Sequence, residues 1–387
     1  MCRIQIKSKE RTLDFNLTED QLMLQTMVRE FTEREIEPIA AQLDREGKLP
    51  DDLIKKYAQI GLMGMTVPVK YGGTEAGSFA HILALEQLAY AGSPAWWPVA
   101  FNNSLPETIC RFGTEAQRER FVKGNFDGTR LFSIQFTEAE TGSDPSALIT
   151  TARPEGDSYL INGMKRFSTF GARDGNALLW AKDETGNCTC FIVEKNAPGY
   201  SASKVWELMG GGGVEPADVY YEDYRVPKEN MLGEKGKGFD VLLYWIAVEK
   251  VEGCIVAVGL AQAALDEAIN YTKNRTVRGK PMSAMQGIRW MLADMYAKIE
   301  ACRWLTYRTA LLLEQDSPDF QTEASATKIF VQPTITEVIG TALRLHGGYG
   351  YTKDFKIERL YRAQPGNVVI SVSLEINKSI VGASLVK

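Results

Sequence analysis

The chain has 387 residues, of which 44% are hydrophobic and 24% are charged. This is the balance of a soluble globular protein, and the length indicates two or three domains. The net charge of −5 argues against a nucleic-acid-binding protein, which usually has a basic face. Only two histidines occur, His81 and His346, which excludes a histidine-rich metal centre. We therefore expect no metal, and a carboxylate as any base that works near neutral pH.

The cysteines and the apolar segments bear on the compartment. Among six cysteines only Cys188 and Cys190 are close together, which is poor spacing for zinc, so reduced core cysteines in a cytosol-like compartment are expected. The N-terminus has no apolar run, and the most apolar stretch, residues 241–265, carries three charges at its middle. These features predict a cytoplasmic protein without a signal peptide, membrane anchor or membrane span.

The first zone, residues 1–128, has helical spacing. Thr18 can cap a helix while Gln21 completes a capping box, and residues 52–63 and 78–91 repeat the helical pattern. Gly72 and Gly73 separate these two segments. We predict an N-terminal helical domain.

In the second zone, residues 129–236, short runs rich in β-branched and aromatic residues alternate with Gly, Asp and Asn. This pattern predicts a compact β-barrel or sandwich. In the third zone, residues 237–387, helical periods return over 239–275, 285–315, 321–345 and a final stretch from Val368. Long helices with short connections indicate a helical bundle. The expected fold class is therefore α+β, with helices, a β-domain and then a helical bundle.

A family resemblance rests on the segment TEAETGSD, residues 137–144, which resembles the TEPxxGSD signature of the acyl-CoA dehydrogenases. Further matches follow in family order along essentially the whole chain. They are ING-x-K at 161–165, RVP at 225–227, LGEKGKGF at 232–239, Y-x3-R at 271–275, GKP at 279–281, LADM at 292–295, HGGYGYT at 346–352 and ERLYR at 358–362. The resemblance implies the same three-domain fold, with an N-terminal helical domain, a middle β-barrel domain and a C-terminal four-helix bundle. It also implies FAD as cofactor and usually a homotetramer.

The resemblance also implies a set of flavin-binding residues. FAD needs hydrogen-bond dipoles along its ring edge, cations near its pyrophosphate and a dry apolar wall. Residues that line or cover the flavin ring would be Ile134, Phe136, Thr137, Phe167 and Thr169, with Gly142 and Ser143 touching both flavin and substrate and Ser373 in the same cofactor set. Residues from the neighbouring subunit that bind the pyrophosphate and adenine would be Arg275, Gln286, Gly347 and Gly348. Glycine there lets the backbone approach phosphate closely.

The family reaction is the α,β-desaturation of an acyl-CoA thioester. A carboxylate removes the α-proton while the β-hydride moves to the flavin, and a backbone N–H helps to hold the thioester carbonyl. The electrons would pass to an electron-transferring flavoprotein. All of this is what the resemblance implies for the present chain.

The base is where the sequence departs from the family. In most members a glutamate stands where this chain has Ser371, whose hydroxyl cannot act as a base near pH 7, although its backbone N–H could hold the carbonyl. The isovaleryl-type enzymes place the glutamate on the first bundle helix, and Glu249 occupies that position, followed by Lys250 in place of an arginine. Glu249 also lies in an apolar run, which tends to raise a carboxyl pKa. The alternatives are a structural ion pair of Glu249, Glu252 as the base, or no α-proton base.

Two tryptophans bear on the substrate. Trp96 and Trp97 are either helix-packing core residues or, with Lys250 and Ser143, part of the substrate site, where they would favour a flat, cyclic or aromatic-bearing acyl group. We predict an acyl-CoA dehydrogenase for a short, branched or cyclic acyl-CoA. Relatives without the usual base catalyse 1,4-dehydrogenation of a cyclic enoyl-CoA or desulfination, and a non-catalytic acyl-CoA-binding relative is a further alternative.

Overall fold

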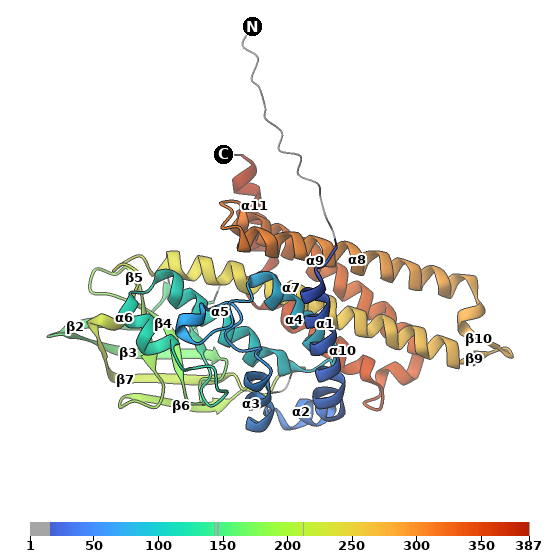
Figure 1. Ribbon diagram of the computed structural model, residues 1–387, viewed down its shortest axis with the longest axis horizontal. Coiled ribbons are helices and arrows are strands. Elements are labelled where there is room, and N and C mark those ends of the chain that lie inside the picture. Colours follow the sequence, from blue (N-terminus) through green and yellow to red (C-terminus); the bar gives the residue numbers. More distant parts are fainter. Residues whose placement is uncertain (1–15, 143, 145–146, 212, 387) are drawn as a thin grey trace, which may run out of the picture.

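A computed structural model describes residues 16–142, 144, 147–211 and 213–386, with Lys204 described by its backbone alone. Helices lead into a β-domain, and a helical bundle follows, which confirms the expected fold class. Figure 1 shows the sheet at one end of the elongated molecule and the long bundle helices running to the other end. The first 15 residues, on which the expectation of no signal peptide depends, lie outside the described part.

The N-terminal domain consists of helices that pack on the bundle. Its elements are α1 Glu19–Phe31, η1 Thr32–Ile36, η2 Glu37–Ile39, α2 Ala40–Glu46, α3 Asp51–Gln59, η3 Val69–Tyr71, α4 Ser78–Ala89, η4 Pro94–Trp96, α5 Trp97–Phe112, α6 Glu115–Gln117 and η5 Arg118–Val122. The predicted capping box at the start of α1 is confirmed, because Gln21 N donates to Thr18 Oγ1 at 3.3 Å and Thr18 N donates to Gln21 Oε1 at 2.9 Å.

The β-domain is one eight-stranded sheet, with strand order β6-β7-β3-β2-β4-β5-β8 and β1 paired in parallel with β4. Its strands are β1 Ser133–Gln135, β2 Thr151–Glu155, β3 Ser158–Ser168, β4 Asn176–Lys182, β5 Cys188–Glu194, β6 Tyr200–Val205, β7 Ala217–Pro227 and β8 Met231–Leu232, with the short helix η7 Lys228–Asn230 before β8.

Both faces of the central strands are buried. On β4, Leu178 and Trp180 belong to the main core shared with the helices, whereas Leu179 and Ala181 belong to a separate core inside the β-domain. Successive side chains of a strand point to opposite faces, so one strand serves both cores. The sheet is therefore fixed to the helical part through the face that carries Trp180, whose Nε1 donates to Gly238 O at the start of the bundle.

The C-terminal domain is built on the 37-residue helix α7 Gly238–Asn274. It is followed by β9 Thr276–Val277, β10 Lys280–Pro281, η8 Met282–Ala284, α8 Gln286–Glu314, α9 Phe320–His346, η9 Gly347–Tyr351, α10 Lys356–Val369 and α11 Leu374–Leu385. The apolar run of residues 241–265 lies within α7, where nearly all of its residues are buried against neighbouring helices.

The prediction of a final helix from Val368 onward was wrong. Helix α10 instead ends at Val369, and a new helix begins at Leu374. The physical reason lies between them: Ser371 has φ 55° and Val372 has φ 74°, and this left-handed backbone cannot continue a right-handed helix. The turn over residues 370–373 is part of the candidate site.

Other sequence expectations can be compared with the described part of the chain. Among the described residues five cysteines are not in disulfides; Cys188, Cys190, Cys254 and Cys302 are buried, and Cys110 is partly buried. Within the described ranges no single helix is long and apolar enough to cross a membrane, although the bent pair α10 and α11 passes that test by length and composition. No group of three or more His, Cys, Asp or Glu side chains in these ranges is arranged to hold a metal ion.

Candidate active site

Helix α7 carries Glu249 into the interior of the molecule, where the residue is 8% exposed. Burial raises the pKa of this carboxyl to about 7; Glu252 raises it further, whereas the Ser371 hydroxyl and the lysines Lys328 and Lys250 lower it. Among the described residues Glu249 has no ion-pair partner within 4.0 Å. The geometry thus gives no support to a structural ion pair and leaves a buried carboxyl that can gain and lose a proton near pH 7.

The turn between α10 and α11 places Ser371 beside Glu249, so the two positions that the sequence singled out lie together. The Ser371 hydroxyl is buried and makes no hydrogen bond of normal geometry within the described chain. Its backbone N–H is likewise not engaged by any described residue. A free donor next to a carboxyl is the arrangement that a thioester carbonyl and its acidic α-proton require.

The neighbouring charged residues of α7 point elsewhere. Lys250 is buried and its Nζ donates to Ser325 Oγ at 2.9 Å, on α9. Glu252 lies one helical turn after Glu249, and its Oε1 is 2.9 Å from Nε2 of His81 on α4. Glu252, which the sequence left open as an alternative base, is therefore held by His81.

The predicted flavin-ring residues lie together at one edge of the β-domain. Ile134 is on β1 and Phe136 and Thr137 follow it, while Phe167 and Thr169 lie at the end of β3. Ser133 Oγ donates to Thr169 O at 2.7 Å and thereby joins the two segments. Both threonine hydroxyl groups make no hydrogen bond to other described residues.

Phe167 has an unusual conformation for a large apolar residue. It is 51% exposed, has a left-handed backbone with φ 57°, and its ring contacts Trp206 with 5.4 Å between centroids. An exposed aromatic ring held in this way, next to two hydroxyl groups that no described residue engages, fits the edge and face of a flat heteroaromatic cofactor. The residues present thus fit the isoalloxazine ring of FAD.

A buried ion pair fixes the signature segment that follows β1. Lys165 Nζ lies 2.7 Å from Glu138 Oε1 and 3.1 Å from Phe136 O, and Glu138 also accepts from Ile149 N at 2.6 Å. Burial lowers the pKa of Lys165 to about 8 despite the opposing effect of Glu138. Next to this anchor, Gly142 has open space where a side chain would stand, and Ser143 lies outside the described residues.

The residues predicted for the pyrophosphate and adenine lie at the opposite end of the bundle. Arg275 directly follows α7 and its guanidinium is 5.9 Å from the ring centroid of Tyr349, while Gln286 begins α8. Gly347 and Gly348 follow α9, and a Cβ at either would meet nothing within 4 Å. Figure 1 shows this end, marked by β9 and β10, far from the sheet. One chain therefore does not bring the two predicted groups of cofactor residues together.

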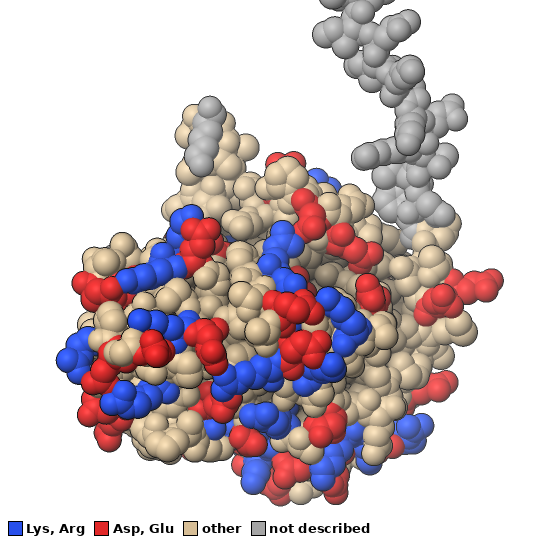
Figure 2. All heavy atoms as spheres, turned by 60° about the vertical axis from the view of Figure 1, so that its left-hand side comes forward, with Lys and Arg blue, Asp and Glu red and all other residues tan. Residues whose placement is uncertain are grey.

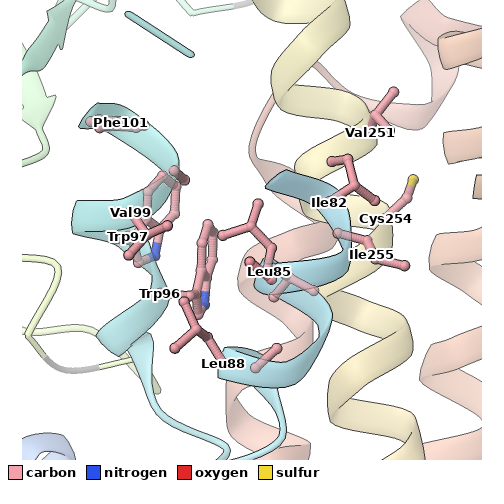
Figure 3. Close-up of a cluster of buried hydrophobic side chains, with 14 of the residues drawn as sticks. Ile82, Leu85, Leu88, Trp96, Trp97, Val99, Phe101, Val251, Cys254 and Ile255 are labelled. Carbon is pink, nitrogen blue, oxygen red and sulfur yellow. The ribbon is translucent and has the colours of Figure 1, made fainter. Parts of the chain in front are cut away.

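Ser373 and the two tryptophans have structural contacts of their own. The Ser373 hydroxyl accepts from Ile376 N and caps α11. Trp96 and Trp97 are 5% and 8% exposed and stack at 4.2 Å between centroids. Figure 3 shows Trp96 between η4 and α4, beside Leu85, in the cluster that also includes α7 side chains. Core packing of both tryptophans is thus observed.

The surface over the β-domain carries both signs of charge. Figure 2, in which this end comes forward, shows Lys and Arg interspersed with Asp and Glu over the visible face. Ion pairs account for part of this mixture, for example Arg120 with Glu194 at 3.1 Å and Lys235 with Glu184. This pattern is consistent with the small net charge of −5.

Comparisons with known proteins assign the family. The N-terminal, middle and C-terminal domains of acyl-CoA dehydrogenases match residues 18–129, 133–224 and 236–386. The chain is 35% identical over 375 residues to the 3-(aryl)acrylate reductase of Clostridium sporogenes, covering 96% of this chain and 99% of that protein. It is 32% identical over 376 residues to the caffeyl-CoA reductase-Etf complex subunit CarC of Acetobacterium woodii, with 96% and 99% covered.

Among solved structures, butyryl-CoA dehydrogenase from Megasphaera elsdenii superimposes with a TM-score of 0.93 and 32% identity, covering 97% of this chain and 100% of that one. The chain belongs to the acyl-CoA dehydrogenase family. It is an oxidoreductase of an FAD-dependent family, as the sequence predicted.

Several residues of the site were not found from the sequence. Lys328 touches the turn that carries Ser371, and Lys165 and Glu138 hold the signature segment. A signal for Lys328 was present, because it lies at helical spacing with Ala324, Val331 and Ile335, which form the buried face of α9. A lysine at an apolar position requires a buried partner.

Proposed function

We propose that this chain is an FAD-dependent acyl-CoA dehydrogenase that desaturates a short, branched or cyclic acyl-CoA, with Glu249 as the α-proton base. The observation that carries the proposal is the juxtaposition of the Glu249 carboxyl, whose pKa burial raises to about 7, with the side chain of Ser371, a residue whose backbone N–H is engaged by no described residue. A base is most effective when its pKa lies near the working pH. Ser371 offers no basic group of its own, so Glu249 takes that role.

The residues of the chain then divide the chemistry. The Ser371 N–H donates to the thioester carbonyl oxygen and stabilises the negative charge that develops there when the α-proton leaves. An oxygen of Glu249 accepts this proton. FAD, when bound, supplies the acceptor for the hydride that leaves the β-carbon. Burial of Glu249 excludes water from the acid-base step.

The test is Glu249→Gln, which keeps the shape of the side chain and removes its basicity. The variant should bind FAD and acyl-CoA, but the rate of substrate-dependent flavin bleaching should fall by about a hundred- to ten-thousandfold, the range that a positioned base contributes. The matched control is Glu107→Gln on α5, because burial also raises the pKa of Glu107 to about 7, but its carboxyl accepts from the Tyr244 hydroxyl at 2.8 Å. Unimpaired bleaching by the Glu249 variant would exclude it as the base.

The proposed substrate class comes from the sequence, in which Trp96 and Trp97 are candidates for the acyl site, although both are packed in the core of this structure. As a wall of the acyl site, the two stacked rings would favour a flat or branched acyl group over a long straight chain, because a rigid aromatic wall restricts the depth available. A panel of butyryl-, isovaleryl-, cyclohexanecarbonyl-, 3-phenylpropionyl- and palmitoyl-CoA, assayed by flavin bleaching, tests this. Faster bleaching by palmitoyl-CoA than by all the others would contradict the proposed specificity.

A second candidate function is the reverse reaction, reduction of an α,β-unsaturated acyl thioester. The observation that favours it is the 35% identity to a 3-(aryl)acrylate reductase. The same residues serve both directions, with Glu249 donating the proton when the substrate is reduced. Reoxidation of the dithionite-reduced protein by cinnamoyl-CoA or crotonyl-CoA, compared with bleaching by the saturated thioesters, measures the preferred direction.

We also propose that the protein is a homotetramer that passes electrons to an electron-transferring flavoprotein. The flavin-ring residues, such as Thr137 and Phe167, lie at the β-domain end of the molecule, whereas Arg275 and Gly347 lie at the other end of the bundle. This separation supports assembly, because a second protomer can supply the pyrophosphate- and adenine-binding residues. The likeness to a subunit of a reductase-Etf complex supports the electron partner. Light scattering gives the mass of the assembly, and anaerobic flavin reoxidation with a purified electron-transferring flavoprotein tests the transfer.

A further inference from the structure

Lys328 on α9 connects the bundle to the turn that contains Ser371. Its side chain is almost completely buried, with a residue exposure of 1%. The Nζ donates to Val372 O at 2.9 Å and also to Ile370 O. One ammonium group thus binds the peptide unit before Ser371 and the peptide unit after Val372, so the two left-handed residues lie between two points that are fixed to α9.

The turn needs such a restraint. Ser371 and Val372 have φ values of 55° and 74°, a conformation that is unfavourable for residues other than glycine and most unfavourable for a β-branched residue such as valine. Two successive residues in this conformation persist only when the surroundings hold them. A second restraint comes from Asn377 on α11, whose Nδ2 donates to Val372 O at 3.3 Å and to Ser373 O at 2.8 Å.

The turn contains a backbone donor that no described residue uses, the N–H of Ser371, and the side chain of the same residue lies beside Glu249. We propose that Lys328 is a positioning residue, which holds residues 370–372 so that the Ser371 N–H is presented to the carbonyl oxygen of the acyl thioester. The inference rests on the proposed function, in which this N–H receives the carbonyl. Lys328 itself touches neither substrate nor cofactor in this role.

A purely electrostatic role is the competing explanation. Lys328 lowers the pKa of Glu249, but so does Lys250, which is buried on α7 and bonds Ser325 rather than the turn. Lys250→Met therefore removes a cation near Glu249 and leaves both contacts of Lys328 with the turn. Comparing Lys328→Met with Lys250→Met separates the restraint of the turn from the effect of charge.

The experiment measures recognition of the carbonyl directly, without turnover. Each variant is made together with Glu249→Gln, and calorimetry gives the dissociation constants of butyryl-CoA and of its thioether analogue S-butyl-CoA, in which a methylene replaces the carbonyl. Lys328→Met should reduce the preference for the thioester about tenfold, as for one lost hydrogen bond, and leave thioether affinity nearly unchanged. Asn377→Ala, which removes no buried charge, should also reduce the preference for the thioester, but by a smaller factor than Lys328→Met. Lys250→Met should leave this preference unchanged.

Two results would overturn the proposal. One is an equal loss of preference in the Lys328 and Lys250 variants, which would assign the effect to charge. The other is a crystal structure of the Lys328→Met protein in which Ser371 and Val372 keep their left-handed conformation, since the turn would then not depend on Lys328. If Lys328→Met does not fold, the thioester-to-thioether affinity ratio of Asn377→Ala is the deciding measurement. An unchanged ratio in that variant would reject the proposal that restraint of the turn controls recognition of the carbonyl.

Failure of the proposed function gives a different pattern. Flavin bleaching that persists in Glu249→Gln would reject the base and still leave the thioester-to-thioether ratio as a measure of the turn. If neither CoA derivative binds the parent protein, the substrate class is wrong, and the crystal structure alone then decides whether Lys328 holds the turn.

Discussion

The Nε2 atom of His81 on α4 lies 2.9 Å from Oε1 of Glu252 on α7, and the two side chains are only 3% and 1% exposed. This pair joins the N-terminal domain to the bundle one helical turn after Glu249. The other ring nitrogen of His81 is buried and has no partner in the described chain. The pair therefore depends on a single hydrogen bond in an apolar interior, where the loss of either partner leaves the other uncompensated.

Removal of one member of this pair should destabilise the fold strongly. His81→Leu leaves the Glu252 carboxyl buried without a partner, and we expect a loss of about 3–5 kcal/mol in the free energy of unfolding. The double variant His81→Leu/Glu252→Leu should lose much less, because no buried polar group remains unpaired. Guanidinium-induced unfolding measures both. Equal losses in the single and double variants would contradict this account.

The pH dependence of the reaction should follow Glu249. Because its pKa is about 7, the base is protonated at lower pH, and kcat/KM should fall tenfold per pH unit well below that value. The negative charge of Glu252 raises this pKa, so Glu252→Gln should move the acidic limb to lower pH. The pH profiles of kcat/KM for the parent protein and for Glu252→Gln measure the shift. A shift to higher pH would contradict the effect assigned to the negative charge of Glu252.

Ser371→Ala should move the acidic limb of the pH profile of kcat/KM to higher pH. The Ser371 hydroxyl lowers the pKa of Glu249, so its removal raises that pKa and more alkaline conditions are needed to ionise the base. The backbone N–H remains, and the affinity for an acyl thioester should change little. The pH profile and a binding titration distinguish the two effects. A large loss of affinity without a pH shift would assign the hydroxyl to substrate binding.

The buried pair of Lys165 and Glu138 should control retention of the cofactor. Lys165→Met leaves the buried Glu138 carboxylate without its cation and releases Phe136 O, so the segment after β1 loses its anchor. We expect destabilisation by about 3–5 kcal/mol and a lower FAD content of the purified protein. Thermal unfolding and the ratio of flavin absorbance to protein absorbance are the measurements. As a control, Lys235→Met removes only an exposed pair with Glu184 and should change neither.

The sequence was sufficient for the three zones because each has its own hydrophobic period, and the helix spacing and strand alternation are local properties. The position of Glu249 was also accessible, since a carboxyl in an apolar run is unusual. The role of Lys328 could not be predicted from the sequence, because it depends on a turn that follows α10 and on φ values that a serine and a valine rarely adopt. The same turn is why the final helix was misplaced. Contacts between residues so distant in sequence are set by tertiary packing alone.

The left-handed conformation of Ser371 and Val372 lowers the stability of the fold, and the same conformation presents the backbone donor that the proposed reaction needs. Each residue in this conformation costs on the order of 1 kcal/mol or more, which the rest of the fold must offset. Sequence changes that relax the turn gain folding free energy and loosen the donor at the same time. Selection for a more heat-resistant protein would therefore tend to erode its turnover first at these two residues.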